Sequence, residues 1–130
     1  MSEKYQPPKR TWFVKFRDTF RGIALGIRGQ TSFAAHLLMT AAVVIAGVVL
    51  RVSLIEWCVL VLCIAVVLGA EMFNSALETL AKAIDEHEND HLRRGLDIAG
   101  AAVLVLSIGA AITGGIVFIY RLGVQLEWWI

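Results

Sequence analysis

Proline and cysteine are scarce in this chain of 130 residues, with two of each. Pro7 and Pro8 are adjacent and precede every long apolar segment, so none of those segments contains a residue that would break a helix. Cys58 and Cys63 lie five residues apart inside an apolar run, which fits neither a CxxC motif nor a disulfide framework. We therefore interpret them as two buried, inert thiols.

The sequence also lacks the usual glycine-rich phosphate loops. It contains no GxxxxGK[ST] segment and no GxGxxG after a strand. Gly22, Gly26 and Gly29 recur at helical spacing instead, which suits close packing or a turn. The N-terminus does not have the pattern of a cleaved signal peptide, because its basic region is followed by an aromatic, charged segment.

What the chain has in excess is hydrophobicity. Apolar residues make up 58% of it and its mean hydropathy is +0.70, whereas roughly 45–50% of a soluble domain is apolar. A single domain of this length cannot hide so much apolar surface in a water-soluble core. The composition therefore predicts one integral membrane domain over residues 1–130.

The N-terminal part predicts a surface helix. Residues 1–8 form a flexible lead, and residues 9–28 place aromatic and aliphatic side chains every three or four positions, with basic residues between them. This pattern is typical of a helix lying in the membrane interface. The alternative is a solvated helix that packs on a partner protein.

Three spanning helices are predicted after it. Residues 33–50 carry no formal charge and hold His36 as their one ionisable group. A second span covers 53–84 and ends in a polar cytoplasmic extension. The third covers 92–121 and is rich in small residues that allow close helix packing.

Charge distribution predicts the orientation of these spans. Seven of the twelve lysines and arginines lie before residue 30, and the second and third spans are joined by a segment with Lys82, Arg93 and Arg94. The positive-inside rule therefore places residues 1–30 and 82–97 in the cytoplasm.

A polar stripe follows the apolar part of the second span. Glu71, Asn74, Glu78, Lys82 and Asp85 fall within about 80° of one another at roughly 100° per residue. A charged group at membrane depth usually faces protein or a wet cleft. A solvated helix end with a Glu78–Lys82 pair accounts for the later residues, but Glu71 directly follows the unbroken apolar run.

This stripe permits phosphoryl transfer to a hydroxyl at the membrane surface. A partly desolvated carboxylate can accept a proton, and a second one can hold Mg²⁺ shared with substrate phosphates. The same groups are compatible with proton or ion transport. His87 and His91 lie in an acidic segment that we interpret as a hydrated loop rather than a zinc site.

Two motifs carry a resemblance to a known family. The segment E-x-x-N-S-A-x-E at Glu71–Glu78, followed by L-D-I-A-G-A-A-V-L at Leu96–Leu104, resembles the small prokaryotic diacylglycerol kinases, which include undecaprenol kinases. The similarity extends from about Phe16 to Phe118 and includes F-R-G at 20–22, Phe33 and His36. The L-I-E-W at Leu54–Trp57 is more similar to the undecaprenol kinase branch.

The resemblance implies an all-α homotrimer in the bacterial inner membrane, with active sites between subunits on the cytoplasmic side. It implies transfer of phosphate from ATP, with Mg²⁺, to a lipid alcohol, either diacylglycerol or undecaprenol; nucleic acid is not an expected partner. The residues it assigns fall into four groups: Glu71 as catalytic base; Glu78 and Gln30 as metal ligands; Glu78, Asp97, Asn89 and Arg94 at the nucleotide; and Glu71, Asn74, Ser75 and Gly100 at the lipid substrate.

Four positions depart from the family pattern. Gln30 replaces a glutamate, Leu96 replaces a lysine that contacts the transferred phosphate, Asp18 replaces an aromatic residue, and Asn89 replaces a histidine. Arg93 or Arg94 can compensate for the missing lysine. The departures motivate an alternative function, a non-catalytic trimeric scaffold that binds lipid.

Overall fold

The computed structural model describes residues 4, 6–28, 31–85 and 87–128, and this part of the chain is helical. Its four helices are α1 (Trp12–Ile27), α2 (Thr31–Val49), α3 (Leu54–Ile84) and α4 (Asp90–Gln125). The prediction of an all-α protein is therefore confirmed.

Among the described residues, α2, α3 and α4 are long and apolar enough to cross a membrane. With 19, 31 and 36 residues and a rise of about 1.5 Å per residue, they measure about 28, 46 and 54 Å. The hydrocarbon layer is about 30 Å thick, so α2 matches it while α3 and α4 extend well beyond it. The prediction of three long apolar helices is confirmed, and each is a candidate membrane span.

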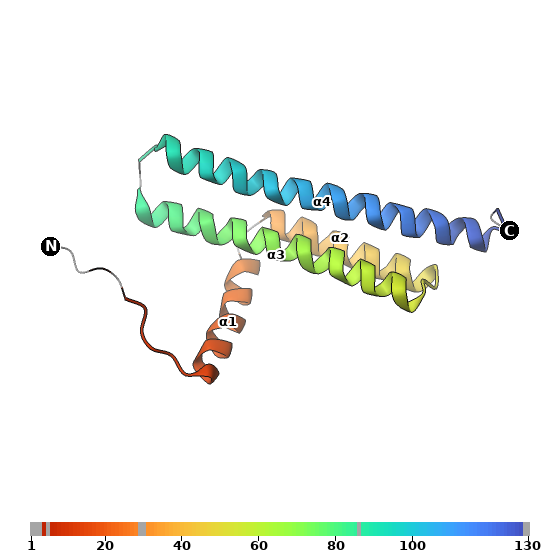
Figure 1. The fold of residues 1–130 in the computed structure, drawn as a ribbon, viewed down its shortest axis with the longest axis horizontal. Helices are drawn as coiled ribbons and strands as arrows, with labels where there is room; N and C mark the ends of the chain where they lie inside the picture. The colour runs from red at the N-terminus through yellow and green to blue at the C-terminus, as the bar shows by residue number, and fades with distance from the viewer. Residues whose placement is uncertain (1–3, 5, 29–30, 86, 129–130) are drawn as a thin grey trace.

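The three long helices run antiparallel to their neighbours in the chain (Figure 1). Helix α3 packs along α4, and α2 packs against α3 with little direct contact to α4. The end of α3 and the start of α4 project past the start of α2, where α1 lies steeply across the bundle (Figure 1). The junction of α1, α2 and the middle of α3 is thus the point where the bundle changes from three helices to two.

Local sequence signals set where the helices begin. Ser53 caps α3 in a reciprocal capping box: its hydroxyl accepts from the Glu56 backbone N–H at 3.4 Å, and the Glu56 carboxylate accepts from the Ser53 N–H at 2.6 Å. Asn89 caps α4 by accepting from the backbone N–H groups of His91 and Leu92.

The turn between α2 and α3 is tied to α4. After α2 ends at Val49, Arg51 adopts the left-handed region at φ 51°, and the Val52 N–H donates to the Gly47 carbonyl at 3.1 Å. Gln125 of α4 donates to the Leu50 carbonyl at 2.9 Å. Arg121 of α4 also pairs with Glu56, so the end of the bundle opposite α1 is held by polar contacts between all three long helices.

Candidate active site

Glu71 is the buried acid of the bundle, with 3% of its surface exposed. Its carboxylate meets two polar side chains from the first turns of α2. The Ser32 hydroxyl donates to Oε1, and His36 Nε2 lies 3.7 Å from Oε2. The acid faces a polar niche inside the protein rather than the acyl chains, as the sequence predicts for a charge at this depth.

The depth of Glu71 follows from its register on α3. It lies seventeen residues after Leu54, which is about 26 Å along the helix axis. That distance is close to the thickness of the hydrocarbon layer. Because α2 also begins at this level, its first polar side chains can reach the carboxylate, whereas the rest of α2 is apolar except for Thr40.

The last turn of α1 packs beside this niche. Gly26 approaches the side chain of Met72, the residue after Glu71, so closely that an added Cβ would lie 3.7 Å from the Met72 terminal methyl. Three helices therefore meet around Glu71. Its burial is a property of a single chain and does not require a neighbouring subunit.

Asn74 and Glu78 form a second polar unit one to two turns further along α3. The Asn74 amide donates to Glu78 Oε1 at 3.1 Å, so the amide orients Glu78 rather than Glu71. Glu78 is half-buried and lies about 10 Å from Glu71 along the axis. Ser75 is buried, and its hydroxyl donates to the backbone carbonyl of Glu71 at 2.9 Å.

The predicted nucleotide residues lie on and before α4. Asp97 and Arg94 are exposed on its first turns, on the segment that projects past α2, and so is Gly100, which the resemblance assigns to the lipid substrate. Asn89 has a structural role here, because its carbonyl oxygen caps α4 and its amide donates to Asp85 at 3.3 Å. A contact of Asn89 with nucleotide stays a prediction.

The predicted metal ligands are Glu78 and Gln30. Gln30 lies outside the described residues. Among those that are described, no group of three or more acidic, histidine or cysteine side chains is placed to hold a metal ion. Magnesium is usually held by one or two carboxylates together with substrate phosphates. A single half-buried carboxylate such as Glu78 fits that mode and does not fit an all-protein cage.

Ser32 and His36 are the site residues that the sequence reasoning did not assign. His36 had a signal, as the single ionisable group in an apolar span, because such a residue usually has a polar partner inside the protein. Ser32 had none, since a serine near the start of a helix is common. Ser32 and His36 contact Glu71 from 39 and 35 positions earlier in the chain, and only the packing of α2 on α3 shows this.

Two acids outside the spans are held in their charged form. The Arg10 guanidinium, which donates to Asp18 at 2.9 Å, lowers the pKa of that carboxyl group, and Arg17 adds to the effect. The backbone N–H of His87, followed by the Asn89 amide, lowers the pKa of Asp85. Asp85 thereby stabilises the loop that leads into α4.

The comparisons with known proteins agree with the motifs. The model of the prokaryotic diacylglycerol kinase family matches residues 17–118. An undecaprenol kinase from Bacillus subtilis is 27% identical over 121 residues, which cover 93% of this chain and 98% of that protein. A diacylglycerol kinase from Synechocystis is 30% identical over 103 residues, or 78% of this chain and 59% of that protein. No solved structure matches significantly.

The family model covers more than three quarters of the chain, from the middle of α1 to the last third of α4, and includes the Glu71 niche and the Asn74–Glu78 pair. The chain therefore belongs to the prokaryotic diacylglycerol kinase family.

Proposed function

We propose that the protein is a kinase that uses ATP and Mg²⁺ to phosphorylate the hydroxyl of a membrane lipid alcohol, diacylglycerol or undecaprenol. The observation that carries this proposal is the Glu71 niche. Ser32 and His36 hold an acid where the apolar part of α3 ends, which is the depth expected for the hydroxyl of a membrane lipid.

Glu71 acts as the general base. It takes the proton of the lipid hydroxyl while the hydroxyl oxygen bonds to the γ-phosphorus of ATP, and the bond from that phosphorus to the bridging oxygen breaks to release ADP. Ser32 and His36 fix the direction of the carboxylate, so little reorganisation is needed when the proton moves.

The nucleotide half of the site uses the projecting parts of α3 and α4. Glu78, oriented by Asn74, is the carboxylate for Mg²⁺, which supplies neutralisation of the phosphate charge when bound. Gln30 is the second ligand predicted from the sequence. Asp97 and Arg94 lie on the first turns of α4 and are accessible to the nucleotide.

The basic residues of α1, together with Lys82 near the end of α3 and Arg93 and Arg94 near the start of α4, support a cytoplasmic location for this end of the bundle in the bacterial inner membrane. We further propose a homotrimer. Many large apolar side chains on α2, α3 and α4 are exposed in the single chain, which leaves ample surface for contacts with other copies and with lipid.

The test is transfer of labelled phosphate from ATP to diacylglycerol or undecaprenol in separate vesicle preparations with Mg²⁺. Glu71→Gln keeps the shape of the side chain and an oxygen that can accept from Ser32, but it cannot take up the proton. We expect turnover to fall by about a hundredfold to ten-thousandfold. Glu127→Gln, an exposed acid just after α4, is the matched control and should keep full activity.

Two results would contradict the proposal. Unchanged turnover in Glu71→Gln would remove the carboxylate from the reaction. Absence of transfer to either lipid by the unmodified protein, in a preparation that is helical and monodisperse, would instead support the lipid-binding scaffold.

A further inference from the structure

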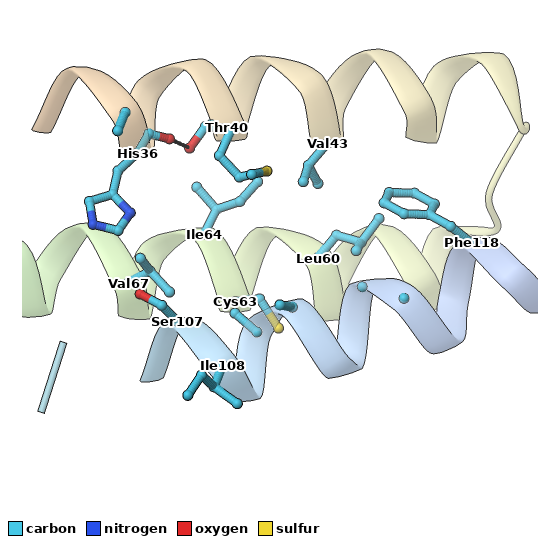
Figure 2. Close-up of a pocket in the computed structure, with 16 residues that line it drawn as sticks. His36, Thr40, Val43, Leu60, Cys63, Ile64, Val67, Ser107, Ile108 and Phe118 are labelled. Carbon is cyan, nitrogen blue, oxygen red and sulfur yellow. Dashed lines mark hydrogen bonds between the residues drawn. The ribbon is translucent and has the colours of Figure 1, made fainter. Parts of the chain in front are cut away.

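A cavity of about 580 Å³ lies between α2, α3 and α4. It exists because α2 and α4 both pack on α3 but hardly touch each other. Figure 2 shows its lining, which is almost entirely aliphatic and small side chains. Neither the Glu78 pair nor the nucleotide residues line it, so it is separate from the phosphate-transfer half of the candidate site.

Its polar atoms gather at one end. The His36 ring and the Ser107 hydroxyl lie at the end shown at the left of Figure 2, whereas Leu60 and Phe118 lie toward the other end. The Ser107 oxygen is buried and has no hydrogen-bond partner among the described residues. A buried hydroxyl without a partner is unfavourable, and a ligand with a polar group at that end would satisfy it.

The polar end of the cavity adjoins the candidate base. His36 lines the cavity and also lies 3.7 Å from the Glu71 carboxylate, with 22% of its side chain exposed. A molecule in the cavity therefore reaches Glu71 past the His36 ring. The Thr40 hydroxyl is already used, because it donates to the His36 carbonyl at 2.8 Å.

The dimensions fit one hydrocarbon chain. One water molecule takes up about 30 Å³ in the liquid, and we use the same volume for each non-hydrogen atom of a ligand. The cavity volume of about 580 Å³ then holds about twenty such atoms. The lining runs from Ala35 to Val43 on α2 and from Ser107 to Phe118 on α4, which are lengths of about 12 and 16 Å.

We propose that the cavity binds one hydrocarbon chain of the lipid alcohol, with the chain extending toward Phe118 and the alcohol end passing Ser107 and His36 to Glu71. This inference rests on the proposed function and distinguishes between its two kinds of lipid alcohol. A single-chain polyprenyl alcohol enters with its whole proximal chain, whereas a diacylglycerol can place only one of its two chains there. The single-chain alcohol is therefore the better acceptor.

A binding experiment without ATP tests this separately from catalysis. The interpretation of both cysteines as buried is wrong for the single chain, because Cys58 is exposed and Cys63 is half-buried. Cys63 lines the cavity, and Cys58 can be removed as Cys58→Ala. In micelles, a prenol of about four isoprene units, which matches the roughly twenty atoms that fit, should slow maleimide labelling of Cys63 by about tenfold. A one-unit prenol should leave the labelling rate almost unchanged. In the converse variant, Cys63→Ala, maleimide labels Cys58 alone, and the long prenol should not slow this labelling.

A cavity-filling variant tests the same point through turnover. Ala110→Leu adds bulk to the lining on α4, and Ala102→Leu makes the same change on an exposed part of α4 outside the lining. We expect Ala110→Leu to lower kcat/KM for the long prenol by about tenfold relative to the short prenol. Ala102→Leu should keep the native ratio, and turnover of the short prenol in Ala110→Leu shows that the variant is folded.

The outcomes separate the two proposals. Cys63 labelling that ignores the prenol, or a long-to-short ratio that Ala110→Leu leaves unchanged, overturns the cavity assignment. Protection of Cys63 that follows protein concentration rather than prenol also overturns it, because a second copy then fills the space. Protection by the long prenol in a protein that phosphorylates no alcohol leaves the binding site standing and refutes the kinase function.

Discussion

Helix α2 is fixed on α3 at both ends, and the contact opposite the Glu71 niche makes a quantitative prediction. Trp57, in the first turn of α3, lies directly on Gly47, near the end of α2. A Cβ added at Gly47 would be 2.6 Å from Cη2 and 2.9 Å from Cζ2 of the indole ring. Carbon atoms in contact are normally about 3.5–4.0 Å apart. Gly47→Ala therefore forces the ring, or α2 itself, to move by about 1 Å.

Two opposing contributions determine the size of the effect. Overpacking of this kind costs about 1–3 kcal/mol, whereas alanine in place of glycine inside a helix stabilises by roughly 0.5–1 kcal/mol. The free energy of unfolding should therefore fall by about 1 kcal/mol in Gly47→Ala. In a Trp57→Leu background the indole ring is absent, so Gly47→Ala should raise the free energy of unfolding by about 0.5–1 kcal/mol.

The measurement is a double-mutant cycle, with unfolding followed as sodium dodecyl sulfate is added to mixed micelles. A change of sign at Gly47 between the two backgrounds corresponds to a coupling energy of about 1–2 kcal/mol, within the range found for residues in contact. If Gly47→Ala has the same effect in both backgrounds, the indole ring does not lie on this glycine, and the fixed position of α2 beside the cavity loses its explanation.

Three further predictions concern other parts of the bundle. Glu56 and Arg121 form an ion pair at 2.6 Å, and their side chains are 17% and 24% exposed. Arg121→Met should lower the free energy of unfolding by about 2 kcal/mol in the same micelle titration. The double variant Arg121→Met, Glu56→Gln should recover part of this loss. The pKa of Asp85 is lowered in the folded state, so the stabilisation that this carboxylate gives the fold is complete above the ordinary pKa of 3.8 and is lost as pH falls through the lower folded pKa. The NMR shift of the His87 amide should therefore titrate with a midpoint below 3.8. A midpoint at or above 3.8 would contradict the lowered pKa. Ser107→Ala removes a buried hydroxyl without a partner among the described residues and should stabilise the lipid-free protein by about 1 kcal/mol, whereas destabilisation would mean that the hydroxyl already has a partner.

Local patterns in the sequence predict much of this fold. Apolar runs between turns identify the three long helices, because each must be apolar over about 20 residues to cross a bilayer. The polar stripe from Glu71 to Glu78 follows from helical periodicity, and the Asn74–Glu78 hydrogen bond joins two of its members at i, i+4. Burial of Glu71 is also predictable, since it directly follows an apolar run.

Contacts between helices lie beyond such patterns. The partners of Glu71 depend on the register of α2 against α3, which is set by packing along their whole length, including Trp57 on Gly47. Asn89 illustrates a different difficulty. The resemblance assigns it to the nucleotide, while its position before α4 makes it an N-cap. One residue can satisfy both patterns, and only the structure shows which contacts it makes in the free protein.

The niche around Glu71 is hard to explain as a device for stability. Taking a carboxylate out of water costs free energy that one serine hydroxyl and a histidine at 3.7 Å only partly recover. A well-packed apolar residue at the same place would often stabilise the bundle as much or more. The acid also adjoins a cavity that a tighter fold would fill. Both costs fall at one point of α3, and both are accounted for if a lipid chain enters the cavity and its hydroxyl gives a proton to this carboxylate.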